Sequence, residues 1–213
     1  MEESKEQGPS PVKLSKKLIT LIAVGVVVVA LIGWIAGTYN RLVSSRETVK
    51  TSWSAVESEY QKRSDLVPNL VSTVKGAANF EQDTLTQVVE ARAKATQTTV
   101  NLDDPSSVDS FSQAQGELSG ALSRLLVSVE AYPELKATQN FSDLQNQLEG
   151  IENRISVARK DYSASARDYN VLRGRFPAVI IANLFGFKER EYFEAEQGAD
   201  QAPAVDFSTE QTN

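Results

Sequence analysis

Three arginines of this chain stand where a helical repeat would turn them toward a core: Arg46, Arg63 and Arg92. A guanidinium group keeps its charge and carries five N–H donors, so its burial is costly unless an acid and further acceptors satisfy it. The acids that we expect to pair with these arginines are Asp65, Glu81, Glu130 and Glu152. Such pairs would either hold the register between helices, with the arginine stems buried along a rim, or line a polar pocket that recognises a ligand or a partner.

Catalytic chemistry has little support in the composition. The chain contains no histidine and no cysteine, so thiolate nucleophiles, disulfides and the Glu-x-x-His pattern of di-iron bundles are excluded. Ser-Lys or Tyr-based nucleophilic catalysis is not excluded by composition, but no Gly-rich loop or nucleophile elbow supports it. We therefore expect no enzyme activity, no cofactor and no metal site.

The net charge narrows the classes of partner. The formal net charge is −6 and the isoelectric point is about 4.9. A surface of this sign repels phosphate backbones, so we expect no nucleic acid partner.

The helix expected to position these residues runs from residue 39 to residue 77. Its core-facing residues recur at alternating steps of three and four, the pattern of a long helix that packs along its length. They are Tyr39, Leu42, Arg46, Val49, Trp53, Val56, Tyr60, Arg63, Val67, Leu70, Val74 and Ala77. Pro68 interrupts the hydrogen bonding of this helix. It predicts either a kinked continuous helix or a stop near Arg63, with Ser64 or Asp65 capping a new helix.

An uncharged apolar run precedes this helix. Residues 18–37 carry no charge, and 20 helical residues span about 30 Å, which matches a bilayer core. A cleaved signal peptide is the alternative, but the run is long for one and the amphipathic helix begins at once after it. We expect an uncleaved membrane anchor. Gly33 and Gly37 form a GxxxG pattern that predicts a weak homodimer.

The orientation of the anchor is indicated by its flanking cations. A cluster of Lys13, Lys16 and Lys17 precedes the run, whereas Arg41, Arg46 and Lys50 follow it at wider spacing. The positive-inside rule then favours a cytoplasmic N-terminus and a bundle outside the cytoplasm.

Three further long helices are expected after the first. They cover residues 78–100, 106–131 and 141–176, with a loop from Asn101 to Ser106 and a break at Pro133. The last helix repeats large residues every seven positions: Phe141, Leu148, Ile155, Tyr162, Tyr169 and Phe176. We therefore expect an all-α fold in which a transmembrane helix leads into an antiparallel bundle of long helices.

The C-terminal part divides in two. Residues 177–187 are apolar but too short to span a membrane. We expect them to cap the open end of the bundle or to rest on the lipid interface. The resulting organisation is a disordered polar head at residues 1–17, an anchor at 18–37, a bundle at 39–187 and an acidic disordered tail at 188–213.

Several motifs occur in order between residues 39 and 193. They are Tyr39-Asn40, Trp53, Arg63-Ser64-Asp65-Leu66-Val67-Pro68-Asn69-Leu70-Val71, Glu81, Ala91-Arg92, Glu130-Ala131-Tyr132-Pro133-Glu134-Leu135-Lys136, Glu152, Ala158-Arg159, Tyr169-Asn170, Phe176-Pro177 and Tyr192-Phe193. Together they resemble the LemA family of bacterial membrane-anchored helical proteins. The resemblance implies an N-terminal anchor in the inner membrane of a bacterial envelope and an antiparallel helical bundle, and it implies no reaction. It also implies a topology with the short N-terminus outside, which is opposite to the lysine argument.

Two functions follow from these observations. The first is a membrane-tethered scaffold that binds other envelope proteins, and the alternative is a small-ligand or stress sensor with a polar pocket near Arg63 and Arg92. The structural or partner-binding candidates are Arg63, Asp65, Pro68, Asn69, Glu81, Arg92, Glu130, Tyr132, Glu152, Arg159 and Asn170.

Overall fold

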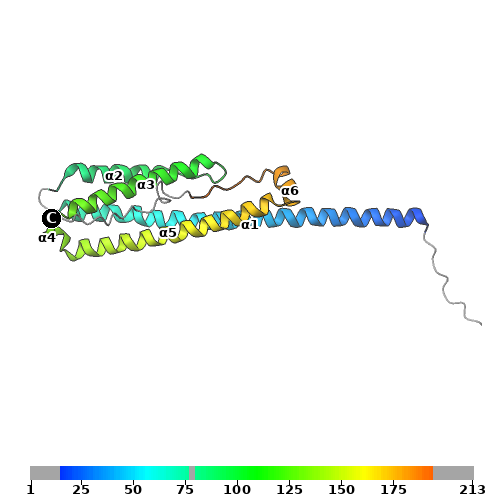
Figure 1. Ribbon diagram of the computed structural model, residues 1–213, viewed down its shortest axis with the longest axis horizontal. Coiled ribbons are helices and arrows are strands. Elements are labelled where there is room, and N and C mark those ends of the chain that lie inside the picture. Colours follow the sequence, from blue (N-terminus) through cyan, green and yellow to red (C-terminus); the bar gives the residue numbers. More distant parts are fainter. Residues whose placement is uncertain (1–14, 77–79, 194–213) are drawn as a thin grey trace, which may run out of the picture.

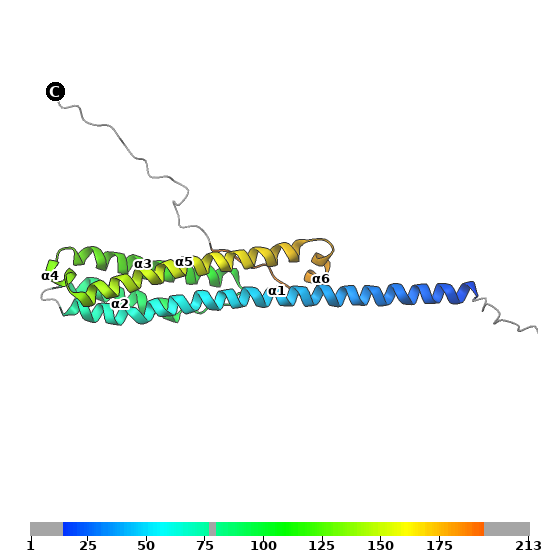
Figure 2. The same ribbon diagram turned by 90° about the horizontal axis from the view of Figure 1, so that it is seen from below.

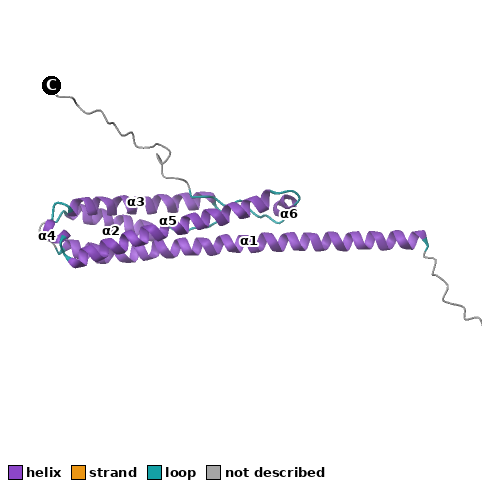
Figure 3. Ribbon diagram, turned by 60° about the horizontal axis from the view of Figure 1, so that its bottom comes forward, coloured by secondary structure: helices purple, strands orange, loops and turns teal. Residues whose placement is uncertain are grey.

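The computed structural model describes residues 15–76 and 80–193 of the chain. Within these ranges the regular structure is helical throughout and contains no strand (Figure 3). The prediction of an all-α fold is therefore confirmed. The expected polar head up to residue 14 and the end of the chain from residue 194 lie outside the described residues.

The first helix, α1 (Lys16–Lys75), is 60 residues long and joins the apolar run to the bundle without a break. It passes through Pro68, so of the two alternatives at this proline the structure shows the continuous helix. Its apolar part is long enough to cross a membrane and is not buried by other elements, which makes it a candidate membrane span. Figures 1 and 2 show this part of α1 projecting alone from the bundle.

The other helices gather around the far half of α1 (Figure 1). They are α2 (Gln82–Gln97), α3 (Pro105–Val129), the short α4 (Pro133–Lys136), α5 (Gln139–Gly174) and α6 (Ala178–Leu184). The long helix α5 runs antiparallel to α1, while α2 and α3 pack on each other and cover the part of the bundle farthest from the span. Side chains begin two of these helices, since Asp104 accepts from the Ser106 N–H and Thr138 from the Phe141 N–H.

The heptad positions form the core, as their spacing predicts. On α1 the buried set runs from Leu42 to Val74, and on α5 it includes Leu148, Ile155, Tyr162 and Tyr169. The repeat ends earlier than expected, because Phe176 is 82% exposed. It ends because α5 itself stops at Gly174, so Phe176 no longer follows the helical phase.

Near the candidate span only α1 and α5 continue, and the C-terminal part of the chain covers them. In α6 the side chains of Ala178, Ile181 and Ala182 are buried. Gly186, at φ 71°, then reverses the chain: its N–H bonds the Asn183 carbonyl, and the N–H of Phe187 bonds the Ala182 carbonyl. This is the Schellman arrangement, in which glycine accepts the left-handed backbone. The expected cap over the open end of the bundle is therefore present.

Beyond Gly186 the chain returns along the bundle as an extended strip, which we call the return segment (residues 187–193). Phe187 and Arg190 in it are buried, and Phe193 packs on the core. Our sequence interpretation assigned residues 188–193 to the disordered tail and missed this packing. Its four consecutive charged residues, 188–191, resemble the start of an acidic tail, and the segment is too short to show a period.

Candidate functional site

The most deeply buried charged side chain among the described residues is that of Arg63, which is 1% exposed. From α1 it points between α3 and α5, where its Nη1 donates to Ser119 Oγ at 2.6 Å and to Glu152 Oε1 at 2.8 Å. Its Nη2 donates to the side-chain oxygen of Gln115 at 2.6 Å and to the Gln115 carbonyl at 3.1 Å. The prediction that Arg63 is ion-paired within the bundle is thus confirmed, and Glu152 is the one of the four expected acids that pairs with it. Gln115 and Ser119 carried no sequence signal beyond lying on a helix.

The Arg63 site is compensated by hydrogen bonds more than by charge. Glu152 keeps 42% of its side chain exposed, so the ion pair reaches the surface at that end. The Arg63 guanidinium lies 4.9 Å from the centre of the Tyr60 ring, a cation–π contact. Only the Nε of Arg63 lacks a partner. The site therefore joins three helices by one cation, as expected of a residue that holds register.

A polar pocket of about 260 Å³ lies beside this site, lined mainly by α1, the end of α2 and α3. Tyr60, Ser64 and Gln115 line it, and they also touch or adjoin the Arg63 site. The Ser64 hydroxyl is buried and has no hydrogen-bond partner among the described residues. Burial raises the pKa of the Tyr60 hydroxyl, which keeps this side chain neutral. The sequence predicted a ligand pocket near Arg63 and Arg92; this pocket adjoins the Arg63 site, but neither arginine is among the residues that line it.

Arg92 donates a hydrogen bond to a backbone carbonyl that Pro68 leaves without its helical partner. A proline has no N–H, so the Ser64 carbonyl, four residues earlier in α1, loses its normal helical partner. The Nε of Arg92 on α2 donates to that carbonyl at 2.8 Å. Both residues were sequence candidates, but only the structure shows that they act together. Arg92 thus fastens α2 to the proline turn of α1.

Most of the expected acid partners contact other residues. Asp65 accepts from Gln61 at 2.8 Å, Glu81 from Thr84 at 3.2 Å and Glu130 from Lys136 at 2.6 Å. Asp65, Glu81 and Glu130 are also exposed, as is Asn69. Our expectation that these three acids neutralise the core-facing arginines is wrong. The physical reason is that Arg46 and Arg92 are only partly buried, so neither needs a carboxylate partner. Arg46 lies over the Phe187 ring, and Arg92 donates to the Ser64 carbonyl.

A second buried arginine, Arg190 of the return segment, is 4% exposed. Its Nη1 donates to the Leu102 carbonyl and lies 2.8 Å from the Asp103 carboxylate, both in the loop between α2 and α3. Its guanidinium also lies 5.7 Å from the centre of the Tyr169 ring. The return segment is therefore tied to the loop that the sequence predicted at residues 101–106.

Asn170 and Arg159, both candidates from the sequence, hold the return segment on α5. The Asn170 amide donates to the Arg190 carbonyl at 2.8 Å and accepts from the Arg190 N–H at 2.9 Å. Arg159 lies 4.7 Å from the centre of the Phe193 ring. The Trp53 ring also stacks on the Phe193 ring, nearly parallel to it and 5.6 Å away between ring centres. Asn170 and Arg159 therefore have a structural role, which is to hold the return segment on α5.

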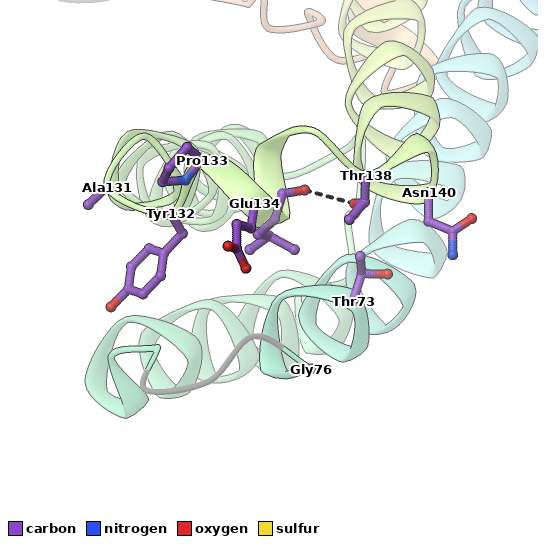
Figure 4. A pocket seen from close by; sticks show the side chains of 9 residues that line it. Thr73, Gly76, Ala131, Tyr132, Pro133, Glu134, Thr138 and Asn140 are labelled. Carbon is purple, nitrogen blue, oxygen red and sulfur yellow. Dashed lines mark hydrogen bonds between the residues drawn. The ribbon is translucent and has the colours of Figure 1, made fainter.

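The tip of the bundle, away from the span, carries an open pocket of about 750 Å³ (Figure 4). It lies between the end of α1 and the turn around α4, and the Tyr132 and Glu134 side chains border it. Tyr132 also packs against Phe80 at 5.0 Å between ring centres. The residues lining it are Thr73, Gly76, Ala131, Tyr132, Pro133, Glu134, Leu135, Thr138 and Asn140. Of these, only Tyr132 was among our candidates.

Two further tyrosines near the return segment have raised pKa values. Burial raises the pKa of Tyr162 to about 12, and its hydroxyl donates to the Glu191 carbonyl at 3.0 Å. Burial likewise raises the pKa of Tyr169, whose hydroxyl donates to the Lys188 carbonyl at 2.8 Å. Both hydroxyls are thus kept as hydrogen-bond donors. Among residues 15–76 and 80–193 no group of three or more carboxylates is placed to hold a metal ion.

These features define a class: an all-helical bundle on a long N-terminal helix that is a candidate membrane span, with arginine-centred contacts inside it. The sequence profile described as the LemA family matches residues 52–207. The chain belongs to the LemA family.

The chain is similar to several named proteins. It is 27% identical to magnetosome protein MamQ 1 of Paramagnetospirillum magneticum, over 81% of this chain and 71% of that protein. It is 26% identical to magnetosome protein MamQ of Magnetospirillum gryphiswaldense, over 93% of this chain and 78% of the relative. Protein LemA of Metamycoplasma hominis is 22% identical, over 76% of this chain and 71% of the relative.

Proposed function

We propose that this chain is a membrane-anchored scaffold of the bacterial envelope that acts by binding a protein partner, not by catalysis. The observation that carries the proposal is the unbroken course of α1 from the candidate span to the tip pocket. The helix rises about 55 Å between residues 39 and 76. A rigid rod of this length holds a binding surface at a set height above a membrane.

The tip pocket is the proposed partner site. It combines an aromatic ring at Tyr132, the ring of Pro133 and an exposed carboxylate at Glu134. Rings that bury large area beside a few polar groups are typical of surfaces that recognise proteins. The Arg63 site supports binding over catalysis in a second way, since nearly all its donors are engaged inside the bundle.

Photo-crosslinking in native membranes tests this proposal. A photoreactive residue placed at Asn140, which lines the tip pocket, is expected to give a defined crosslinked partner. The same group at the exposed Ser156 of α5 is the control and is expected to give none. Tyr132→Ala should remove the product while helical content is kept. Equal crosslinking at both positions, or a product that survives Tyr132→Ala, contradicts the proposal.

A second function, sensing of a small ligand, is favoured by one observation. Ser64 Oγ is buried without a partner at the edge of the 260 Å³ pocket beside Arg63. A buried unpaired hydroxyl is costly, and a polar ligand would satisfy it. Mass spectrometry of the protein purified from native membranes is expected to find a bound compound that Ser64→Val lacks. Identical spectra for both proteins contradict this function.

We further propose that the bundle lies outside the cytoplasm. The support is the early lysine cluster, of which Lys16 and Lys17 begin α1, against the more widely spaced cations after the span. Because the chain has no cysteine, single substitutions report sidedness cleanly. An impermeant maleimide should label Asn146→Cys in intact cells and leave Ser4→Cys unlabelled. The reverse pattern would place the bundle in the cytoplasm.

A weak homodimer through Gly33 and Gly37 is also proposed. A Cβ atom at either glycine would meet nothing within 4 Å, so this face of α1 is open to a second helix. Replacing both glycines with leucine should abolish any dimer seen by crosslinking in vesicles. A dimer that persists would place the contact elsewhere.

A further inference from the structure

The contact between α1 and the residues around α6 indicates how far α6 lies from a membrane that α1 would cross. The Tyr39 ring lies 5.0 Å from the Phe185 ring and 5.6 Å from the Phe187 ring, measured between centres. Tyr39 stands two residues after the apolar run that ends at Gly37, which is about 3 Å along the helix axis. If the run crosses a bilayer, Phe185 therefore lies at the level where the hydrocarbon gives way to headgroups. Figures 1 and 2 show α6 beside α1 at the point where α1 leaves the bundle.

The face of α6 that does not cover the bundle is strongly apolar. Ile180 is 56% exposed, Leu184 74% and Phe185 53%, and Phe176 just before the helix is 82% exposed. Ile180 and Leu184 are spaced four apart on α6 and therefore share one face of it, and Phe176 lies in the turn that leads into the helix. The other large aliphatic side chains exposed on the described bundle are scattered singly over α2, α3 and α5: Val89, Val127, Val157 and Val171. A cluster of this kind indicates a contact surface.

The charges around this cluster are suited to headgroups. Residues 176–187 contain no charged side chain, while exposed cations stand at both ends of the segment, Arg175 before it and Lys188 after it. Arg41 is also exposed, two residues after Tyr39 on α1. An apolar surface between cations matches the boundary of acyl chains and phosphates.

We propose that the bundle has a second membrane contact: Phe176, Ile180, Leu184 and Phe185 lie in the interface of the bilayer that α1 crosses. The two faces of α6 then have different contacts. The buried face closes the open end of α1 and α5, and the exposed face rests on lipid. One helix alone leaves a bundle able to tilt and rotate about its anchor, whereas a second contact beside it fixes which way the bundle leans. The inference rests on the anchoring part of the proposed function and is independent of the partner and of the side of the membrane.

Spin labels on the full-length protein test this contact. The protein is reconstituted in phosphatidylethanolamine–phosphatidylglycerol vesicles with one label each at Leu184→Cys, Val127→Cys or Val27→Cys. Val127 is 71% exposed on α3, matching Leu184 in exposure, and Val27 lies within the apolar run. Access to oxygen, which concentrates in lipid, is compared with access to a water-soluble nickel chelate. Because Leu184 and Val127 are both exposed, labelling them leaves the core intact, and unchanged melting curves verify this.

The labels at positions 184 and 27 are expected to favour oxygen severalfold more than the label at position 127. If position 27 reports lipid while position 184 reports water, the second contact is refuted and the anchor stands. If position 184 is shielded from both reagents, a second protein surface covers it and the lipid contact is refuted. If position 27 reports water, the anchoring and this inference fail together.

Discussion

The bundle contains two buried arginines, and their surroundings differ. Arg63, in the half away from the candidate span, sits on a long helix and is held by side chains of two other helices. Arg190, in the half near the span, sits on an extended strip and is held largely by a loop carbonyl and a loop carboxylate. Where α2 and α3 cover α1 and α5, helices supply the partners of the cation. Where only α1 and α5 run side by side, α6 and the return segment cover the core between them.

The comparison shows two ways to complete a helical core. Arg63 occupies a heptad position of α1, and its partners Gln115, Ser119 and Glu152 lie on the helices that pack against it. Arg190 depends on the turn at Gly186 and on Asn170, which binds its backbone from α5. The first arrangement is stiff because three helices share it. The second is held by a loop and by side chains of α5, so we expect the return segment to be able to detach while α1 and α5 stay folded.

The largest expected effect is at Arg63. Arg63→Ala should lower the free energy of unfolding by about 3 kcal/mol, because it leaves Gln115 and Ser119 unpaired beside a cavity. Denaturant unfolding followed by circular dichroism measures the loss. The control is Arg154→Ala, which removes a 3.0 Å pair with Glu59 whose arginine is 55% exposed, and should cost about 0–1 kcal/mol. Equal losses for both variants would mean that the Arg63 site is solvated.

A smaller and more local effect is expected at Arg190. Arg190→Ala should cost about 2 kcal/mol, because the charged hydrogen bonds to the loop are lost. Release of the return segment should also remove Phe193 from Trp53, so we expect a shift of the Trp53 emission in a Trp34→Phe background. Lys188→Ala is the matched control, since Lys188 is exposed and makes one bond, 3.2 Å to the Asp103 carbonyl. An unchanged Trp53 emission in Arg190→Ala would refute the difference between the two halves.

The link between Pro68 and Arg92 should give a coupling of about 1 kcal/mol. Arg92→Leu is expected to destabilise the protein because the Ser64 carbonyl loses its hydrogen-bond donor, the Nε–H of Arg92. In a Pro68→Ala background the restored N–H supplies that bond, and the same change at Arg92 should cost less. A double-mutant cycle of unfolding free energies measures the coupling. Strictly additive effects would show that Arg92 and Pro68 act separately.

The smallest effect is a dependence of the unfolding free energy on pH, which is expected only in alkaline solution. Tyr162 has a folded pKa of about 12 against 10.0 in the unfolded chain, raised chiefly by burial. A raised pKa favours the neutral folded form, so its stabilisation is complete below pH 10.0 and is lost as the pH rises toward about 12. Unfolding free energies measured across this range should fall more steeply for the native protein than for Tyr162→Phe. Parallel slopes would mean that Tyr162 is solvated and that the return segment leaves α5 open.

Part of this protein was predictable from sequence alone, because its signals are periodic. Heptad spacing predicts α1 and α5, an uncharged run of helical length predicts the candidate span, and Arg63 stands out as a charge in an apolar repeat. Glu152 was one of four acids expected to pair with the core-facing arginines, and the sequence did not single it out from the other three. Periodicity is a local property that survives in a single chain.

Only the tertiary structure decided the contacts that lack a period. Arg190 lies in six residues that look like the start of an acidic tail, and its burial depends on a loop 87 positions earlier, at Asp103. Gln115 and Ser119 gained their role from the direction in which Arg63 points. The Ser64 carbonyl needed Arg92 because Pro68 removed an N–H, and no spacing in the sequence relates α2 to that turn. Each of these contacts joins groups that folding alone brings within hydrogen-bond distance, so composition and periodicity could not reveal them.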